Sequence, residues 1–486
     1  MTKPCDLTAV EARRLIGQRK LSPVELLESC LERIAATNPA VNAVVALDAD
    51  AARVAAKDTE RAIKSGDALP LLAGLPVGVK DLQATKNLRT TWGSLLFETN
   101  VPTADEASVA NVRAAGGIIL GKTNTPEFGA GSNTRNRVYG ATGNPFDPNL
   151  TCAGSSGGSA VSLALGHMPL CTGSDYGGSL RTPASFCGVV GFRPSPGVVP
   201  SVERAASLIP FGVTGPMGRT VADAHLLLKA QIDSDRRDPF SSGDGFGIAD
   251  ELAGTDLTSL RVAVSPDLGC APVEKAIRDV FNSRVATFKS VFHETQERAP
   301  DFSGVHDVFE ILRGVYFVAA HRERLEKSRH LLDRNVADNT ERGLAYSLGD
   351  VARANVEQTK IYKRFIAFFE DVDVLICPAA SVSPFPHSQL FVEEIDGEKM
   401  PTYMRWLAIT YAPTMALACS AVLPCGVDHK GMPFGIQVIG PKGADAFVLE
   451  VAYALEQVLS RNKETARPLP DIAKLSKAKP LDTKRG

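Results

Sequence analysis

The sequence lacks the cysteine and histidine patterns that would predict a disulfide framework or a metal site. Its nine cysteines are an odd number, are spread along a chain of 486 residues and form no C-x-x-C pair. None of its eight histidines lies in an H-E-x-x-H motif or a comparable cluster. We therefore interpret the cysteines as buried thiols of a protein in a reducing compartment, and we expect no metal.

The sequence also has little net charge and no long hydrophobic run. A formal charge of −2 and an isoelectric point near 6.5 give no electrostatic reason to expect nucleic acid or an anionic membrane as partner. The first residues hold no apolar signal core, and no apolar stretch is long enough to cross a bilayer. We therefore expect a cytoplasmic protein that acts on a small molecule.

Hydrophobic periodicity predicts a helical start followed by an alternating α/β pattern. The helical start covers residues 7–63 and breaks at Asn38-Pro39. Strands are predicted over 76–80, 118–120, 168–172, 189–192, 260–264, 374–377, 420–423 and 434–439, and helices over 107–115, 159–166, 221–232, 362–369 and 444–459. After Arg467 the chain is rich in Lys and Pro, which predicts a poorly ordered tail.

Two glycine loops that carry serines hold the candidate chemistry. They are Gly154–Ser159, with sequence GSSGGS, and Asp175–Arg181, with sequence DYGGSLR. Glycine lets the backbone approach a substrate and point its N–H groups at a developing oxyanion. A serine hydroxyl beside such a loop is a candidate nucleophile, but it needs a base. Lys80 ends the apolar segment 75–80, which would bury its stem and favour the neutral amine, so Lys80 is the candidate base.

A phosphate-binding motif is the first alternative interpretation. Residues 116–123 match the pattern G-x-x-x-x-G-K-[ST]. The middle of this segment is apolar and strand-like, and Asn124-Thr125-Pro126 follows it where a helix should begin. The context therefore argues against a nucleotide site.

A histidine-dependent hydrolase is the second alternative. Residues 154–158 match the G-x-S-x-G elbow with Ser156 as nucleophile, for which His387 or His429 would have to be the base. Neither histidine lies in a distinctive motif. The simplest interpretations, a flexible linker for the first loop and a surface Asp–Arg turn for the second, also remain open.

Taken together, these segments resemble the amidase signature family. The resemblance spans nearly the whole chain, although it is thin between about residues 233 and 371. The matched blocks are residues 78–81, 121–128, 154–159, 175–181, 186–191, 214–217, 221–224, 423–426 and 431–437. The resemblance implies an α/β fold in which helices cover both faces of a twisted mixed β-sheet, and it implies no metal or organic cofactor.

The resemblance also implies one amidase domain over residues 1–486. We expect it to consist of an N-terminal helical segment, a catalytic core, a mainly helical outer region, a C-terminal part of the core and a tail. These parts cover residues 1–70, 71–218, 219–370, 371–466 and 467–486, respectively.

The resemblance implies a Ser-Ser-Lys triad. Ser179 would be the nucleophile, Ser155 the bridging serine after a cis peptide bond, and Lys80 the base. Lys80 would take a proton from Ser155 and Ser155 one from Ser179, which would attack a carbonyl to form an acyl-enzyme. The oxyanion hole would be made by the N–H groups of Tyr176, Gly177 and Gly178, with that of Ser179 as a further candidate, and the loops would be braced by Ser156, Asp175 and Arg181.

The implied reaction is hydrolysis of the C–N bond of a small linear amide, with esters and carbamates as further candidate substrates. Phe128, Tyr139, Phe146 and Tyr176 lie in or near the matched blocks and favour a hydrophobic, neutral amide. Tyr176 stands where the family more often has a small or β-branched residue, and residues 412–419 replace its usual T-G-x-P-A stretch. Both departures concern the shape of the pocket.

One alternative function belongs to another class. A glutamine-hydrolysing subunit of a tRNA-dependent amidotransferase would have the same triad. In that branch the residues after the nucleophile typically read R-Q-P, whereas this chain has Arg181-Thr182-Pro183. A stand-alone enzyme is therefore the preferred interpretation, with its state as monomer or homo-oligomer left open.

Overall fold

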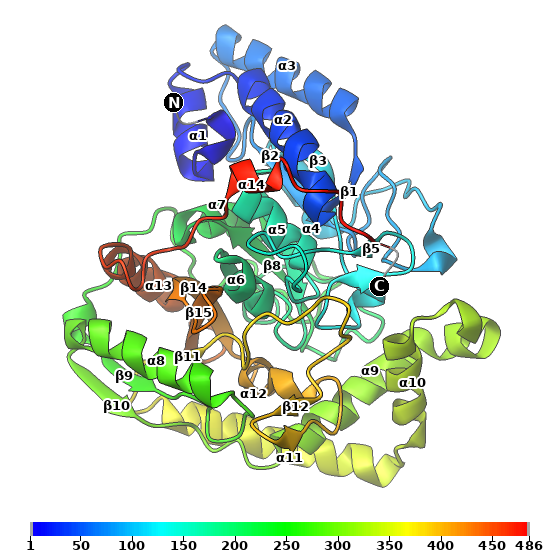
Figure 1. Cartoon of the computed structure of the whole chain (residues 1–486), viewed down its shortest axis with the longest axis vertical. Coiled ribbons are helices and arrows are strands. Elements are labelled where there is room, and N and C mark those ends of the chain that lie inside the picture. Colours follow the sequence, from blue (N-terminus) through cyan, green and yellow to red (C-terminus); the bar gives the residue numbers. More distant parts are fainter. Residues whose placement is uncertain (1–2, 484–486) are drawn as a thin grey trace.

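The computed structural model describes residues 3–483 and places eleven strands in one mixed sheet (Figure 1). In spatial order the strands are β1 (Val44–Leu47), β3 (Ile118–Thr123), β2 (Pro76–Lys80), β6 (Leu170–Asp175), β8 (Val213–Gly218), β7 (Val190–Arg193), β14 (Cys419–Val427), β15 (Pro433–Gly440), β11 (Val374–Pro378), β9 (Arg261–Val264) and β10 (Glu294–Glu297). Strand β2 runs parallel to β3 and β6, and β9 runs parallel to β10 and β11, whereas the other pairs are antiparallel.

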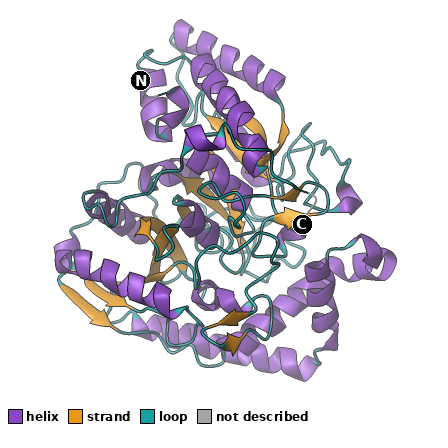
Figure 2. Ribbon diagram, in the orientation of Figure 1, coloured by secondary structure: helices purple, strands orange, loops and turns teal. Residues whose placement is uncertain are grey.

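Helices cover both faces of this sheet, as the sequence predicts (Figure 2). One group consists of α5 (Gly157–Leu165) and α6 (Arg181–Cys187), which pack against each other and against the central strands. The other group consists of α4 (Ala107–Ala114), α7 (Val221–Gln231) and α13 (Asp445–Ser460). Strand β6, which leads into the second serine loop, therefore lies inside the sheet rather than at its edge.

The N-terminal region differs from the sequence prediction in two ways. Helices α1 (Ala9–Gly17), α2 (Pro23–Val41) and α3 (Ala49–Ser65) form one end of the molecule in Figure 1. The predicted break at Asn38-Pro39 is wrong, because α2 continues through Pro39 to Val41. Pro39 lies in the last turn, where it removes a single helical hydrogen bond, and Asn38 Oδ1 accepts the following N–H groups of Ala43 and Val44 at 2.9 Å each.

The second difference is β1, which interrupts the predicted helical stretch of residues 7–63. Its four residues pair antiparallel with β3 at the edge of the sheet. A four-residue strand contains too few residues to show a period of two, and the pairing that stabilises it comes from residues about 75 positions later.

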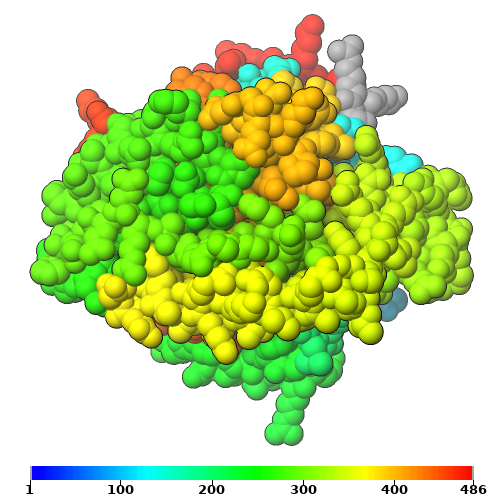
Figure 3. Space-filling model, turned by 90° about the horizontal axis from the view of Figure 1, so that it is seen from below, coloured from blue at the N-terminus to red at the C-terminus, as the bar shows by residue number. Residues whose placement is uncertain are grey.

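The outer region extends the same sheet. It contains α8 (Lys275–Phe288), α9 (Val305–Ser328), α10 (Arg334–Ala345) and α11 (Leu348–Phe368), and its strands β9 and β10 continue the central sheet at one edge. Helix α9 packs against both α10 and α11. Figure 3 shows α11, in yellow, running across this face of the molecule. No helix of residues 3–483 is long and apolar enough to cross a membrane.

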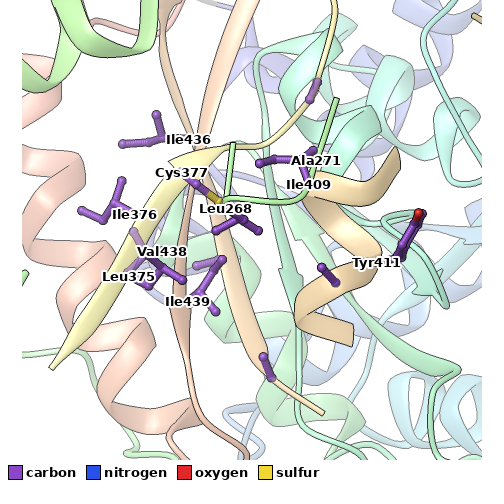
Figure 4. Close-up of a cluster of buried hydrophobic side chains, with 14 of the residues drawn as sticks. Leu268, Ala271, Leu375, Ile376, Cys377, Ile409, Tyr411, Ile436, Val438 and Ile439 are labelled. Carbon is purple, nitrogen blue, oxygen red and sulfur yellow. The ribbon is translucent and has the colours of Figure 1, made fainter. Parts of the chain in front are cut away.

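Buried aliphatic side chains join the C-terminal strands to this region. In the cluster of Figure 4, Leu375 and Ile376 of β11 lie beside Val438 and Ile439 of β15. Nearby, helix α12 (Ala408–Met415) contributes Ile409 and Tyr411 to the cluster.

The C-terminal tail, for which composition predicts poor order, contains helix α14 (Ile472–Leu475), which packs on α2. Residues 484–486 of this tail lie outside the described residues.

Candidate active site

Lys80 is the last residue of β2, and its side chain is fully buried. Its Nζ lies 2.7 Å from Ser155 Oγ, 2.8 Å from Ser156 Oγ and 3.0 Å from Ser174 Oγ. Burial lowers the pKa of Lys80 to about 7, while the nearby carboxylate of Asp175 acts in the opposite direction. A large fraction of this amine is therefore neutral near neutral pH.

The first serine loop follows β5 (Gly140–Ala141) in the chain and runs into the first turn of α5. The Gly154–Ser155 peptide bond is cis. Gly158, in the first turn of α5, lies so close to the segment after β3 that an added Cβ would be 2.2 Å from the backbone nitrogen of Asn124. Only glycine permits this approach, and it brings Ser155 and Ser156 onto Lys80.

The second serine loop is built around the buried carboxylate of Asp175. Its oxygens accept the N–H groups of Gly178 at 2.9 Å and Leu180 at 3.0 Å. They also form salt bridges with Arg181 at 3.0 Å and Arg193 at 3.1 Å, and all three charged side chains are fully buried. Burial by itself would raise the pKa of Asp175, but the two arginines hold it well below its usual range.

Helix α12 braces this loop from the other side. Arg181 donates to the carbonyl of Thr410 at 2.6 Å and to the hydroxyl of Thr414 at 2.8 Å. The hydroxyl of Thr410 donates in turn to the carbonyl of Gly177 at 2.7 Å. Gly178 has a φ of +121°, and a Cβ there would lie 2.2 Å from Thr410 Oγ1. The loop is thus rigidly held by residues more than 200 positions later in the chain.

The predicted oxyanion-hole donors differ in their availability. The N–H of Gly178 is engaged by Asp175, so it is directed into the loop. Within the described part of the chain, the N–H groups of Tyr176, Gly177 and Ser179 donate no hydrogen bond. Three donors of this loop are therefore free, and Gly178 has a supporting position instead.

Ser179 lies in the same cavity as Ser155 and Ser174. Its carbonyl accepts the N–H of Ser156 at 3.2 Å, which ties the two serine loops together. The Ser179 hydroxyl makes no hydrogen bond to any described residue. The structure therefore has the hydrogen bond between Lys80 and Ser155 but not one between Ser155 and Ser179. Catalytic hydrogen bonds of this kind often tighten only when substrate is bound.

The cavity above Ser179 has a volume of about 210 Å³ and mixed walls. Its apolar side chains are Leu82, Phe128, Tyr176, Pro200, Ile209, Val213, Tyr316 and Phe317, and its charged ones outside the loops are Glu106, Glu203, Arg204 and Arg313. Tyr139 and Phe146, which the sequence favours as neighbours of the site, do not line it. A larger cavity of about 650 Å³ lies between α9 and α11 and contains none of the predicted site residues.

The observed contacts support neither of the two alternative motifs, the G-x-S-x-G elbow or the phosphate-binding loop. Neither His387 nor His429 hydrogen-bonds to Ser156, whose hydroxyl instead contacts Lys80 and Ser174. The phosphate-loop match forms the buried strand β3. Its Lys122 donates to the carbonyl of Gln83 and, at 2.8 Å, to Thr85 Oγ1.

Two residues of the site were not found by sequence reasoning. Ser174 lies on the same face of β6 as Thr172, whose hydroxyl accepts the N–H of Lys80 at 3.1 Å. Their spacing of two residues along a strand was the available signal. Arg193, at the end of β7, gave no comparable local signal, because its partner Asp175 lies on a strand that is separated from β7 by β8.

Comparison with known proteins identifies the family of this chain. The family model described as Amidase matches residues 25–449. An acylamidase of Rhodococcus erythropolis is 32% identical, covering 93% of this chain and 95% of that protein. A glutamyl-tRNA(Gln) amidotransferase subunit of Acaryochloris marina is 30% identical, covering 92% of this chain and 97% of that protein. The crystal structure of a bacterial aryl acylamidase superposes with a TM-score of 0.87 at 26% identity, covering 98% and 99%.

The fold and these relatives define an amide hydrolase that acts on C–N bonds. The chain belongs to the amidase signature family.

Proposed function

We propose that this hydrolase works through a Ser-Ser-Lys triad in which Ser179 is the nucleophile, Ser155 relays the proton and Lys80 is the base. The observation that carries the proposal is the buried Lys80 amine, with its pKa lowered to about 7 and its nitrogen 2.7 Å from Ser155 Oγ. Ser179 opens into the cavity directly beside this pair. A neutral amine held against a hydroxyl is the arrangement that activates a weak nucleophile.

In the proposed reaction, neutral Lys80 takes a proton from Ser155, and Ser155 takes one from Ser179. The Ser179 oxygen attacks the amide carbon, and the N–H groups of Tyr176, Gly177 and Ser179 stabilise the resulting oxyanion, each typically worth about 3–4 kcal/mol. The proton on Lys80 returns through Ser155 to the leaving nitrogen, and the C–N bond breaks to leave an acyl-enzyme. Water then attacks the acyl-enzyme, its proton follows the same path, and Ser179 is restored.

For the substrate, we propose small amides with an aryl or alkyl portion, with esters and carbamates as slower or parallel substrates. The aromatic rings of Phe128, Tyr176 and Tyr316 in the cavity wall support this class. The acylamidase and aryl acylamidase relatives also support it. Apolar walls discriminate weakly, since one methylene changes binding by about 1–3 kcal/mol, so a range of acyl chains should be accepted.

A second candidate function is hydrolysis of glutamine as one subunit of a tRNA-dependent amidotransferase. The observation that favours it is the 30% identity to one component of such an enzyme over 92% of this chain. The purified chain discriminates between the two functions. A stand-alone amidase hydrolyses an anilide unaided, whereas an amidotransferase component requires its partners and prefers glutamine.

The triad is tested with a fluorophosphonate probe that labels activated serines. Ser179→Ala should lose the covalent adduct. Ser156→Ala should keep it, although the Ser156 hydroxyl also accepts a hydrogen bond from Lys80. Labelling that persists in Ser179→Ala and disappears in Ser156→Ala would restore the elbow interpretation.

A further inference from the structure

One wall of the cavity above Ser179 is lined by two buried arginines. Arg313, on α9, is 5% exposed. Arg204 follows β7 in the chain, and its side chain is 6% exposed. Both guanidinium groups line the same cavity as Ser155 and Ser179. Burial of two cations beside a catalytic serine requires either internal partners or a ligand.

The internal partners of Arg313 are all neutral. Its Nε donates to Asn339 Oδ1 at 3.0 Å, and its Nη2 donates to the hydroxyl of Tyr403 at 2.9 Å. Its guanidinium carbon lies 4.6 Å from the ring centre of Phe317 and 5.4 Å from that of Tyr176. Among residues 3–483, no carboxylate forms a salt bridge with Arg313. Its charge is therefore stabilised by rings and amide groups but is not neutralised.

Arg204 has one carboxylate partner and one unused group. Its Nη1 forms a salt bridge with Asp238 at 3.1 Å, and its Nε donates to the carbonyl of Gly212 at 3.3 Å. Its Nη2 is buried and has no hydrogen-bond partner among the described residues. The same is true of the hydroxyl groups of Tyr176 and Ser201, which line the same cavity. Buried donors without partners are costly, so the described residues leave the hydrogen-bonding groups of this wall incompletely satisfied.

The acidic residues that line the cavity do not pair with Arg313, and one of them, Asp175, forms its salt bridges with Arg181 and Arg193. Both carboxylate oxygens of Glu106 are occupied, because they accept from Gln83 at 3.0 Å, from Ser108 at 2.8 Å and from the N–H of Ala84 at 3.1 Å. Glu203 is exposed and forms no salt bridge with a described residue. Arg313 therefore lines the cavity without a carboxylate partner among the described residues.

We propose that Arg313 and Arg204 form a carboxylate subsite, so that the substrate has an anionic end in addition to its scissile amide. A carboxylate accepts hydrogen bonds from guanidinium and hydroxyl donors in the geometry that arginine favours. The rings around the subsite bind the apolar part of the same molecule. This inference rests on the proposed amidase function and replaces the neutral amide that the sequence favours with an amphiphilic one.

The test compares three anilides whose acyl chains have the same length and end in a carboxylate, a methyl group or an amine. We expect the wild-type protein to prefer the carboxylate-ended anilide in kcat/KM. Arg313→Gln should lower kcat/KM for that substrate by about 10- to 100-fold, the range for a charge-assisted hydrogen bond, and leave the methyl-ended anilide nearly unchanged. Arg322→Gln, on the same helix but exposed and paired with Glu326, is the matched control.

If Arg313 has a purely structural role, Arg313→Gln should lower kcat/KM equally for all three anilides, and that result overturns the proposal. So does a wild-type preference for the methyl-ended or amine-ended chain. If Arg313→Gln does not fold, Arg204→Gln tests the same subsite and should show the same selective loss. Binding of the carboxylate-ended anilide to Ser179→Ala, measured by calorimetry, separates the two proposals, because it depends on the subsite and not on the nucleophile.

Discussion

Two fully buried lysines lie on the neighbouring parallel strands β2 and β3, and their surroundings differ. Among the described residues, the Lys80 amine donates only to the hydroxyls of Ser155, Ser156 and Ser174, and two of these serines, Ser155 and Ser174, line the cavity. Lys122 donates to the backbone carbonyl of Gln83, a residue of the cavity wall, and to the hydroxyl of Thr85, which does not line the cavity.

The neighbouring charges of the two lysines also differ. Burial lowers the pKa of both, to about 7 for Lys80 and about 8 for Lys122. Two nearby carboxylates, Asp81 and Glu106, oppose this for Lys122, whereas Asp175 near Lys80 is already paired with two arginines. Burial alone therefore does not make a base. The proposed base also needs a hydroxyl that can relay protons to the substrate, and Lys80 contacts Ser155, which lines the cavity.

The largest expected effect is on catalysis at Lys80. Lys80→Ala should lower kcat for an anilide by roughly 10²–10⁴-fold, because proton transfer to and from Ser155 is lost. An activated ester should suffer less, since its leaving group departs without a proton. Steady-state kinetics on an anilide and a nitrophenyl ester measure both effects. A variant that hydrolyses the two substrates at wild-type rates would exclude Lys80 as the base.

The converse change should act on stability. Lys122→Met removes a buried cation and leaves the nearby carboxylate of Asp81 and the carbonyl of Gln83 without it, which typically costs about 3–5 kcal/mol. Denaturant unfolding should therefore show a much larger loss of unfolding free energy for Lys122→Met than for Lys80→Met, because the hydrogen-bond partners of Lys80 are neutral hydroxyls. Equal losses in the two variants would contradict the division between a base and a structural cation.

The pH dependence of activity should follow Lys80. Its pKa is lowered to about 7, so activity should rise as pH increases through this value, since only the neutral amine accepts a proton. Below that pH, kcat/KM should fall about tenfold per pH unit. The acid limb should disappear in Lys80→Ala and persist in Lys122→Met, measured at a temperature at which both variants stay folded. A limb that survives in Lys80→Ala belongs to another group.

The smallest effect concerns the third hydroxyl around Lys80. Ser174→Ala removes an acceptor 3.0 Å from Nζ, which disfavours the ammonium and should move the acid limb to lower pH. A hydrogen bond of about 1 kcal/mol corresponds to somewhat less than one pH unit. Thr85→Val, which removes the equivalent hydroxyl from Lys122, should leave the limb in place. A limb that stays fixed in Ser174→Ala would mean that this hydroxyl does not hold the charged form.

The hydrophobic pattern of the sequence predicts the buried strands, but it does not predict strands that are exposed or whose hydrophobic pattern is interrupted. Strand β2 has its predicted bounds because its five residues are all buried, so it forms a continuous apolar segment between glycines and prolines. Strand β10, with the sequence Glu-Thr-Gln-Glu, is mostly exposed at the sheet edge and has no hydrophobic pattern. Strand β8 was recognised only as a family block, because Gly215 and Pro216 interrupt its pattern.

The same distinction holds for the site. Lys80, Ser155 and Ser179 lie in local motifs whose glycines serve the backbone geometry, so the sequence could indicate them. Arg313 could not be found this way, because an isolated arginine on a helix has no motif. Its position in the cavity depends on how α9 packs against α12, an arrangement that only the whole fold determines.

The bracing of the nucleophile loop by Thr410 and Arg181 also sets the order of events during synthesis. Strands β14 and β15 occupy the middle of the sheet, yet they come from the last fifth of the chain. A chain that ends before residue 400 would already contain Lys80, Ser155 and Ser179 and still lack the helix that holds Gly177. If Ser179 is the nucleophile as proposed, such a fragment should not react with a fluorophosphonate, and the emerging polypeptide should gain activity only when it is nearly complete.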